Sequence, residues 1–118
     1  MNHPPRLRRG TVWEARLDPV EGSEQGGTRP VLVISSDSLN GPLPVITVAA
    51  MTSRKTERVF ATEVVVEPPE GGLTRRSKVL LYQTRTISKT RIGDQLGRLS
   101  PDTMARIDAA LRLALDLP

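Results

Sequence analysis

Short runs of apolar, β-branched residues, separated by turn-forming residues, constrain the fold of this chain more than any other feature of its sequence. Residues 30–35 (PVLVIS) and 45–50 (VITVAA) are continuous runs, and residues 11–17 (TVWEARL) alternate between apolar and polar side chains. Runs of about four to eight residues with this composition are typical of β-strands. Further short strands are expected at residues 62–67, 79–83, 84–88 and 95–99.

Helical periodicity is clear only near the C-terminus. Ser100 is a favourable N-cap, Pro101 suits the first helical position, and Asp102 complements the positive end of the helix dipole. The apolar residues that follow recur on one face, at Met104, Ile107, Leu111, Ala114 and Leu115. The pattern predicts a mainly β, α+β fold: a small SH3-like antiparallel barrel or bent sheet of about seven strands, with a C-terminal helix packed on it.

The length and composition indicate one domain in a reducing compartment. A chain of 118 residues suits a single domain over residues 1–118, with a flexible tail expected at residues 1–8. No apolar run approaches the ~20 residues of a membrane span, and no secretion signal is recognisable. The absence of cysteine excludes disulfides and thiol catalysis. We therefore expect a cytoplasmic protein with no membrane partner.

Positive charge is concentrated in one stretch of the sequence. The chain has a net charge of +4, whereas residues 71–98 hold seven arginines and lysines against one acidic residue, Asp94, a net charge of +6. A basic stretch of this kind indicates an acidic partner such as a nucleic acid, although a solvated charged face is the simpler alternative.

Most common catalytic arrangements cannot be built from this sequence. His3 is the only histidine, and it falls in the expected tail, which excludes a two-histidine ribonuclease and argues against a Ser–His–Asp triad. No nucleotide-binding glycine loop and no metal-ligand spacing of histidines or cysteines is present. A carboxylate metal site is conceivable, but nothing in the spacing favours it: Asp18, Glu21, Glu24 and Asp37. No metal and no cofactor is expected.

Two positions remain as candidates for chemistry. Residues 22–30 (GSEQGGTRP) form a polar, glycine-rich loop that ends in Arg29, and the proline that follows favours an extended backbone at this arginine. Thr52 and Ser53 place two hydroxyl groups at the end of an apolar strand. Taken alone, the spacing favours structural roles, with Arg29 as a salt-bridging edge residue and the hydroxyls as ordinary strand-end groups.

Five sequence blocks change this balance, because together they resemble one known family. They are RGTVW (9–13), GSEQGGTRPVLVIS (22–35), ITVAAMTS (46–53), LLYQTRTISKTRIG (80–93) and GRLSPDTMARIDAALRLALDL (97–117). In this order they are similar to the MazF/PemK family of endoribonuclease toxins, the toxin half of bacterial toxin–antitoxin pairs. The resemblance runs over nearly the whole chain, from about residue 9 to residue 117.

The resemblance implies site residues at matching positions. The arginine before the proline falls on Arg29, the strand-end threonine on Thr52, and the glutamate of the GSEQ loop on Glu24; these are the predicted catalytic residues. Tyr82 departs from the family, whose members often carry an acidic or another polar residue there. The predicted RNA contacts are Gln25, Thr28, Ser53, Arg54, Lys55, Arg58, Gln83 and Arg85.

The resemblance also implies an activity and partners. The expected reaction is metal-independent, sequence-specific cleavage of single-stranded RNA by the ribose 2′-hydroxyl, which leaves a 2′,3′-cyclic phosphate and a 5′-hydroxyl. Arg29 and Thr52 would stabilise charge on the phosphate, while Glu24 would orient Arg29 or act as the base. The implied partners are a second copy of the chain and an acidic antitoxin whose disordered C-terminal tail blocks the RNA groove.

Two other functions are compatible with a barrel of this kind. One is a non-catalytic SH3-like-barrel module that binds nucleic acid or protein, and the other is a toxin of the same architecture that poisons DNA gyrase. The presence of both Arg29 and Thr52 favours the nuclease.

Overall fold

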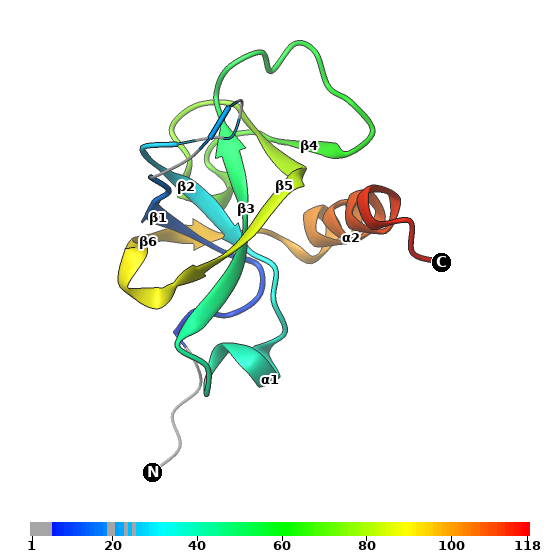
Figure 1. Cartoon of the computed structure of the whole chain (residues 1–118). Helices are drawn as coiled ribbons and strands as arrows, with labels where there is room; N and C mark the ends of the chain where they lie inside the picture. The colour runs from blue at the N-terminus through cyan, green and yellow to red at the C-terminus, as the bar shows by residue number, and fades with distance from the viewer. Residues whose placement is uncertain (1–5, 19–20, 23, 25) are drawn as a thin grey trace.

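The computed structural model describes residues 6–18, 21, 22, 24 and 26–118, which form a bent antiparallel sheet with a helix packed against it (Figure 1). In this part of the chain the sheet has six strands in the order β4-β5-β3-β2-β1-β6. The strands are β1 (Thr11–Arg16), β2 (Thr28–Val33), β3 (Val45–Thr52), β4 (Glu63–Val66), β5 (Ser77–Ser88) and β6 (Ile92–Arg98). The helices are α1 (Asp37–Asn40) and α2 (Pro101–Leu115), with 3₁₀ turns η1 (Glu70–Gly72) and η2 (Lys89–Arg91).

The sheet is open rather than closed, because β4 and β6 lie at its two ends. The predicted fold, a bent antiparallel sheet with a C-terminal helix packed on it, is therefore confirmed, with six strands in the described residues where about seven were expected. Residues 79–83 and 84–88, expected as two strands, belong to the single strand β5, and the strand expected at 95–99 begins earlier, at Ile92. A shift in the β3–β5 register between Ala49 and Met51 shows that β5 bends within its length instead of stopping.

Both faces of the sheet are covered, which explains the continuous apolar runs in the sequence. Alternate side chains point to opposite faces. One set of buried residues packs under α2, and it includes Val12, Leu32, Met51 and Ile107. The other set includes Trp13, Val31 and Val48 on the opposite face. Trp13 is 3% exposed, which confirms that this aromatic residue belongs to the core.

The C-terminal helix begins and packs as the sequence predicts. The Ser100 hydroxyl accepts a hydrogen bond from the Thr103 backbone N–H at 3.2 Å, and Pro101 is the first helical residue. Ile107 is fully buried, and Met104 is half-buried against the same cluster, so this methionine belongs to the packing interface. No helix in the described residues is long and apolar enough to span a membrane.

Replacing Ser100 by alanine removes the capping oxygen from a helix that covers one face of the core. We expect the free energy of unfolding to fall by about 1 kcal/mol, the usual cost of losing such a cap. Urea denaturation measures the change. The matched variant Ser100→Asp keeps a capping oxygen and is expected to stay close to the original stability; equal losses in both variants would contradict a capping role.

Candidate active site

The pairing of β2 with β3 brings Arg29 and Thr52 together. The two strands are antiparallel, with Val31 opposite Ala50. Continuing that register by two residues places Arg29 opposite Thr52. Residues two apart on a strand point to the same face, so both side chains lie on the same face of the sheet as the pair Val31 and Ala50. Both side chains line one pocket of about 180 Å³ at the end of β3, together with Thr28 and Ser53. Two of the three predicted catalytic residues are thus neighbours in space, although they lie 23 positions apart in the sequence.

The Arg29 guanidinium is held from one side. Its Nε–H donates to the Gly26 carbonyl oxygen at 2.5 Å, and the side chain is half-buried. Within the described part of the chain, its two terminal nitrogens make no hydrogen bond. A guanidinium in this position has two parallel donors that match two oxygens of a phosphate.

Thr52 is buried, with 6% of its surface exposed. Its hydroxyl oxygen accepts from the Arg54 backbone N–H at 3.1 Å, which ends β3 in a turn. Because the oxygen is already an acceptor, the hydroxyl hydrogen remains able to donate to a bound group. The threonine is therefore fixed in position and chemically suited to add a second donor beside Arg29.

Glu24, the third predicted catalytic residue, is not among the residues that line this pocket. It is exposed, and its backbone N–H donates to the Glu21 carbonyl oxygen at 3.2 Å. Gln25, a predicted RNA contact, lies outside the described residues, as does His3. No three histidine or carboxylate side chains gather around one point in the described ranges, so the carboxylates considered as a metal site do not meet there.

A second pocket, of about 320 Å³, adjoins the first through Thr52, which lines both. Three of the predicted RNA contacts lie here: Arg54, Lys55 and Gln83. The pocket is completed by Lys78, Leu80 and Tyr82 of β5. Arg54 and Lys55 come from the segment after β3, so the strand end and the following turn supply the basic side of this pocket.

Two predicted RNA contacts lie outside both pockets. Arg85 Nη1 donates to the Leu17 carbonyl oxygen at 2.6 Å, which ties β5 to the residue after β1. The Arg58 side chain is exposed, while its carbonyl oxygen accepts from Lys78 Nζ at 2.8 Å. Arg85 therefore has a structural partner that the sequence pattern did not indicate.

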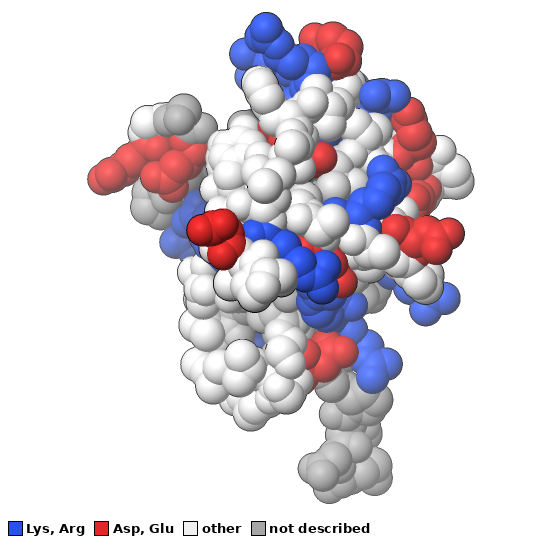
Figure 2. Space-filling view, turned by 90° about the vertical axis from the view of Figure 1, so that its right-hand side faces the viewer, with Lys and Arg blue, Asp and Glu red and all other residues white. Residues whose placement is uncertain are grey.

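The basic stretch 71–98 does not form one surface. Most of it lies in β5 and β6, which are separated in the sheet by β3, β2 and β1. Arg76 pairs with Glu67 at 2.5 Å, so part of its charge is compensated locally. Figure 2 shows blue and red side chains interspersed over the face that it presents. The charge relevant to a ligand is therefore the local set around Thr52.

A buried ion pair supports the second pocket, and sequence reasoning missed it. Lys78 Nζ lies 2.9 Å from Glu63 Oε1, and their side chains are only 6% and 1% exposed. The Phe60 backbone N–H donates to the same carboxylate oxygen at 2.9 Å, and the Tyr82 hydroxyl donates to Oε2 at 3.2 Å. Only the β4–β5 pairing, with Glu63 opposite Leu80, brings these groups together, and that register was not legible in the sequence.

The carboxyl group of Glu63 is ionised in this environment. Burial alone would raise its pKa, but the Phe60 N–H, the Lys78 ammonium and the Tyr82 hydroxyl together hold the pKa below the usual value of 4.5. Tyr82 shifts the other way: burial, then the charge of Glu63 and the hydrogen bond to it, raise the pKa of the phenol above 10.0. At neutral pH the phenol is therefore a donor and the carboxylate an acceptor.

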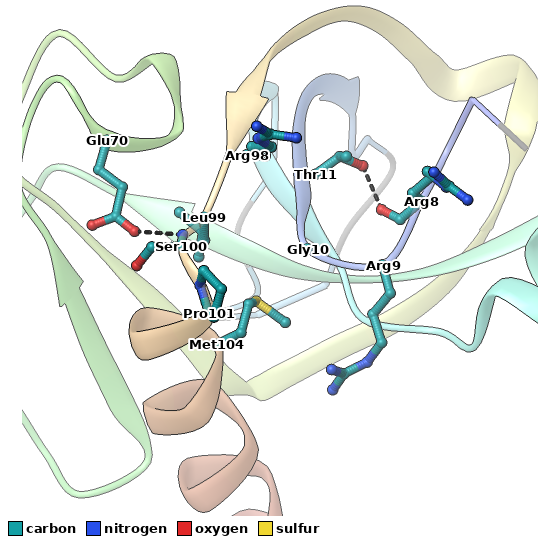
Figure 3. Close-up of a pocket in the computed structure, with 10 residues that line it drawn as sticks. All are labelled: Arg8, Arg9, Gly10, Thr11, Glu70, Arg98, Leu99, Ser100, Pro101 and Met104. Atoms are coloured by element: carbon teal, nitrogen blue, oxygen red, sulfur yellow. Dashed lines mark hydrogen bonds between the residues drawn. The ribbon is translucent and has the colours of Figure 1, made fainter.

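A larger hollow, of about 710 Å³, lies elsewhere, where β1 begins and β6 ends beside the start of α2 (Figure 3). Two hydrogen bonds at this hollow hold neighbouring segments together. Thr11 donates to the Arg8 carbonyl oxygen at 2.5 Å, and Glu70 accepts the Ser100 N–H at 2.9 Å. Arg9 extends away from the hollow and pairs with Asp108 at 2.7 Å. This arrangement fastens α2 to the sheet and contains neither Arg29 nor Thr52.

The bent sheet, the C-terminal helix and the arginine–threonine pocket define a small α+β protein whose pocket suits a phosphate group. A sequence model of PemK-like, MazF-like toxins of type II toxin–antitoxin systems matches residues 8–115. The chain therefore belongs to this toxin family.

Solved structures agree with this assignment. An endoribonuclease from a mycobacterial species, in complex with its cognate antitoxin, is 30% identical with a TM-score of 0.78, over 94% of this chain and 96% of that chain. The Mycobacterium tuberculosis toxin MazF-mt6 is also 30% identical with a TM-score of 0.78, over 92% and 98%. MazF from Deinococcus radiodurans is 26% identical with a TM-score of 0.81, over 98% and 100%.

Proposed function

We propose that this chain is a toxin endoribonuclease that cleaves single-stranded RNA at a specific sequence and is neutralised by a cognate antitoxin. The observation that carries the proposal is the shared pocket of Arg29 and Thr52, in a chain similar to solved endoribonucleases over nearly its full length. The relative solved with its cognate antitoxin supports the partner.

The chemistry that fits the pocket needs no metal ion. The ribose 2′-oxygen attacks the adjacent phosphorus and loses its proton, the bond from phosphorus to the 5′-oxygen breaks, and that oxygen gains a proton. The products are a 2′,3′-cyclic phosphate and a 5′-hydroxyl. Catalysis then depends on aligning an internal nucleophile and on stabilising charge at the non-bridging oxygens.

Arg29 and Thr52 supply that stabilisation. The free end of the guanidinium donates two hydrogen bonds to the non-bridging oxygens, and the threonine hydroxyl adds another. Arginine is a poor base because its pKa lies above ~12. Glu24 does not line the pocket, and its proposed role is to orient Arg29, which follows it in the same segment of the chain.

RNA lies across both pockets in this proposal. Thr28 and Ser53 contact the chain at the first pocket, while Arg54, Lys55 and Gln83 contact it at the second. Single-stranded bases can be read along their edges, and arginine and lysine neutralise the phosphates. Arg58 and Arg85 extend the proposed contact set beyond the pocket walls, and Gln25, outside the described residues, remains a proposed contact.

Removing the basic contacts should change the salt dependence of binding. In Arg54→Ala and in Arg58→Ala, we expect the slope of log K against log salt concentration to become shallower by about 0.7, the value for one phosphate contact on a single strand. Binding is measured with an RNA whose cleavage nucleotide carries 2′-deoxyribose, so that it is not cut. Arg112→Ala on α2 is the matched control, because Arg112 lines neither pocket. Unchanged slopes in both test variants would remove these arginines from the RNA contact set.

The proposed antitoxin fits the same surface, whereas the proposed homodimer rests on the resemblance to the toxin family. The basic groups around Thr52 suit the acidic, disordered C-terminal tail of an antitoxin, which would order as it occupies the RNA groove. We place the groove near the interface of a homodimer, and the toxin in the cytoplasm, where its RNA substrate is found.

One experiment separates this function from the two alternatives. The purified protein is incubated with a long single-stranded RNA and, separately, with DNA gyrase in a supercoiling assay. Cleaved RNA with unaffected supercoiling is expected. Inhibited supercoiling with intact RNA would indicate the gyrase poison, and no effect in either assay, with the protein folded, would indicate a binding module.

A further inference from the structure

Tyr82, the single tyrosine of the chain, exposes an aromatic ring in the second pocket. The chain holds one tryptophan, one tyrosine and one phenylalanine. Trp13 is in the core, and Phe60 is not among the residues that line the second pocket. Tyr82 lines that pocket together with Thr52 and is 53% exposed, although Leu81 beside it is buried. An aromatic face is therefore available to a ligand next to the proposed catalytic threonine.

The ring is anchored at its far end. The hydroxyl donates to Glu63 Oε2 at 3.2 Å, and Glu63 is fixed by Lys78 at 2.9 Å and by the Phe60 N–H at 2.9 Å. The pair is almost fully buried, so the anchor is rigid, whereas the ring that it holds is half-exposed. Restricting the ring before a ligand arrives lowers the entropy cost of binding.

We propose that Tyr82 is the stacking platform for one nucleobase of the RNA, adjacent to the phosphate at Arg29 and Thr52, and that it contributes to the choice of cleavage site. The inference rests on the proposed function. Single-stranded bases stack on exposed aromatic rings, whichever base is present. Gln83 follows Tyr82 on β5 and lines the same pocket, so a polar amide lies beside the proposed platform, where it can contact the edge of the stacked base.

Two substitutions separate the role of the Tyr82 ring from the role of its hydroxyl bond to Glu63. Tyr82→Ala removes the ring, and we expect kcat/KM at the preferred site to fall about 5- to 100-fold, with weaker base preference at one position of the cleavage motif. Tyr82→Phe keeps the ring and loses the hydroxyl with its hydrogen bonds to Glu63 and Gln83, so the base preference is expected to remain. Leu117→Ala is the control, because it removes an exposed apolar side chain that lines neither pocket.

Stacking can also be observed directly in the unaltered protein. Because Tyr82 is the only tyrosine, protein labelled with ¹³C-tyrosine gives ring signals from this residue alone. The probe is a short RNA of the preferred motif with 2′-deoxyribose at the cleavage nucleotide, which binds without being cut. We expect an upfield shift of the ring signals on titration, caused by the ring current of the stacked base. This measurement does not depend on the folding of any variant.

The outcomes distinguish this subsite from the proposed function. If the unaltered protein cleaves RNA but the tyrosine signals do not shift, or if Tyr82→Ala folds and retains both rate and motif, the stacking role is overturned while the nuclease function stands. If the unaltered protein cleaves no RNA, the proposed function fails, and the subsite fails with it. A shift accompanied by a changed motif in Tyr82→Ala, and not in Leu117→Ala, supports the proposal.

Discussion

Replacing Arg29 by alanine is expected to lower kcat for RNA cleavage by about 10²–10³-fold, the usual effect of removing one preorganised donor to a developing oxyanion. Arg29 lines the pocket with Thr52, and its guanidinium can donate two parallel hydrogen bonds to a phosphate. The fold should survive, because the side chain is half-buried and, within the described residues, its one hydrogen bond is to the Gly26 carbonyl oxygen.

The measurement is the single-turnover cleavage rate at saturating enzyme, with unfolding followed in parallel by circular dichroism. Arg29→Lys keeps the positive charge but loses the paired donors, so we expect it to recover only part of the rate. A folded Arg29→Ala protein that cleaves as fast as the unaltered chain would show that Arg29 is not catalytic.

Replacing Lys78 by methionine is expected to lower the free energy of unfolding by about 3–5 kcal/mol, a large share of the stability of a domain of this size. The substitution leaves the Glu63 carboxylate, 1% exposed, without its counter-ion. It also removes the bond from Nζ to the Arg58 carbonyl oxygen, which holds the segment after β3. Urea denaturation at neutral pH measures the loss.

The double variant Glu63→Leu/Lys78→Met tests whether charge is the cause. Replacing both members of a buried pair by apolar residues is often close to neutral, so the double variant should recover most of the stability. A double variant as unstable as Lys78→Met would indicate that the lysine acts through packing, and would contradict the unpaired carboxylate as the cause.

The pair of Glu63 and Lys78 makes the free energy of unfolding depend on pH. Because the folded-state pKa of Glu63 is lowered, its stabilising contribution is complete above its usual pKa of 4.5 and is lost as the pH falls through the lower, folded-state value. In Lys78→Met the buried carboxylate favours its protonated form instead. The stability difference between the two proteins should therefore shrink as the pH falls, first through the raised pKa of Glu63 in the variant, above 4.5, and then through its lowered pKa in the unaltered protein.

Hydrophobic runs and a helix-capping signal in the sequence were sufficient to predict β2, β3 and the start of α2. The apolar runs that became β2 and β3 are continuous because both faces of the sheet are covered, and the capping signal at Ser100 marked the start of α2 correctly. Arg29 and Thr52 came from a resemblance, and the β2–β3 register explains why they meet. Predicting β2, β3 and the start of α2 required no knowledge of long-range contacts, and explaining how Arg29 meets Thr52 requires only the β2–β3 pairing.

The remainder depends on contacts that no local pattern encodes. The polar residues Gln83 to Arg85 resemble a break between strands, yet they continue β5 because β3 pairs along its length. Arg85 bonds to Leu17 across 68 positions, and Glu63 meets Lys78 only through the β4–β5 register. The basic stretch 71–98 is continuous in the sequence, but sheet order separates β5 from β6.

The most direct test of the central claim is to map every new end produced when the purified protein acts on a long single-stranded RNA in the presence of EDTA. We expect cuts at one short recurring motif, with 2′,3′-cyclic phosphate and 5′-hydroxyl ends, and cleavage about 10²–10³-fold slower with Arg29→Ala. Ends bearing a 3′-hydroxyl and a 5′-phosphate, or cleavage that requires a divalent metal ion, would contradict the claim.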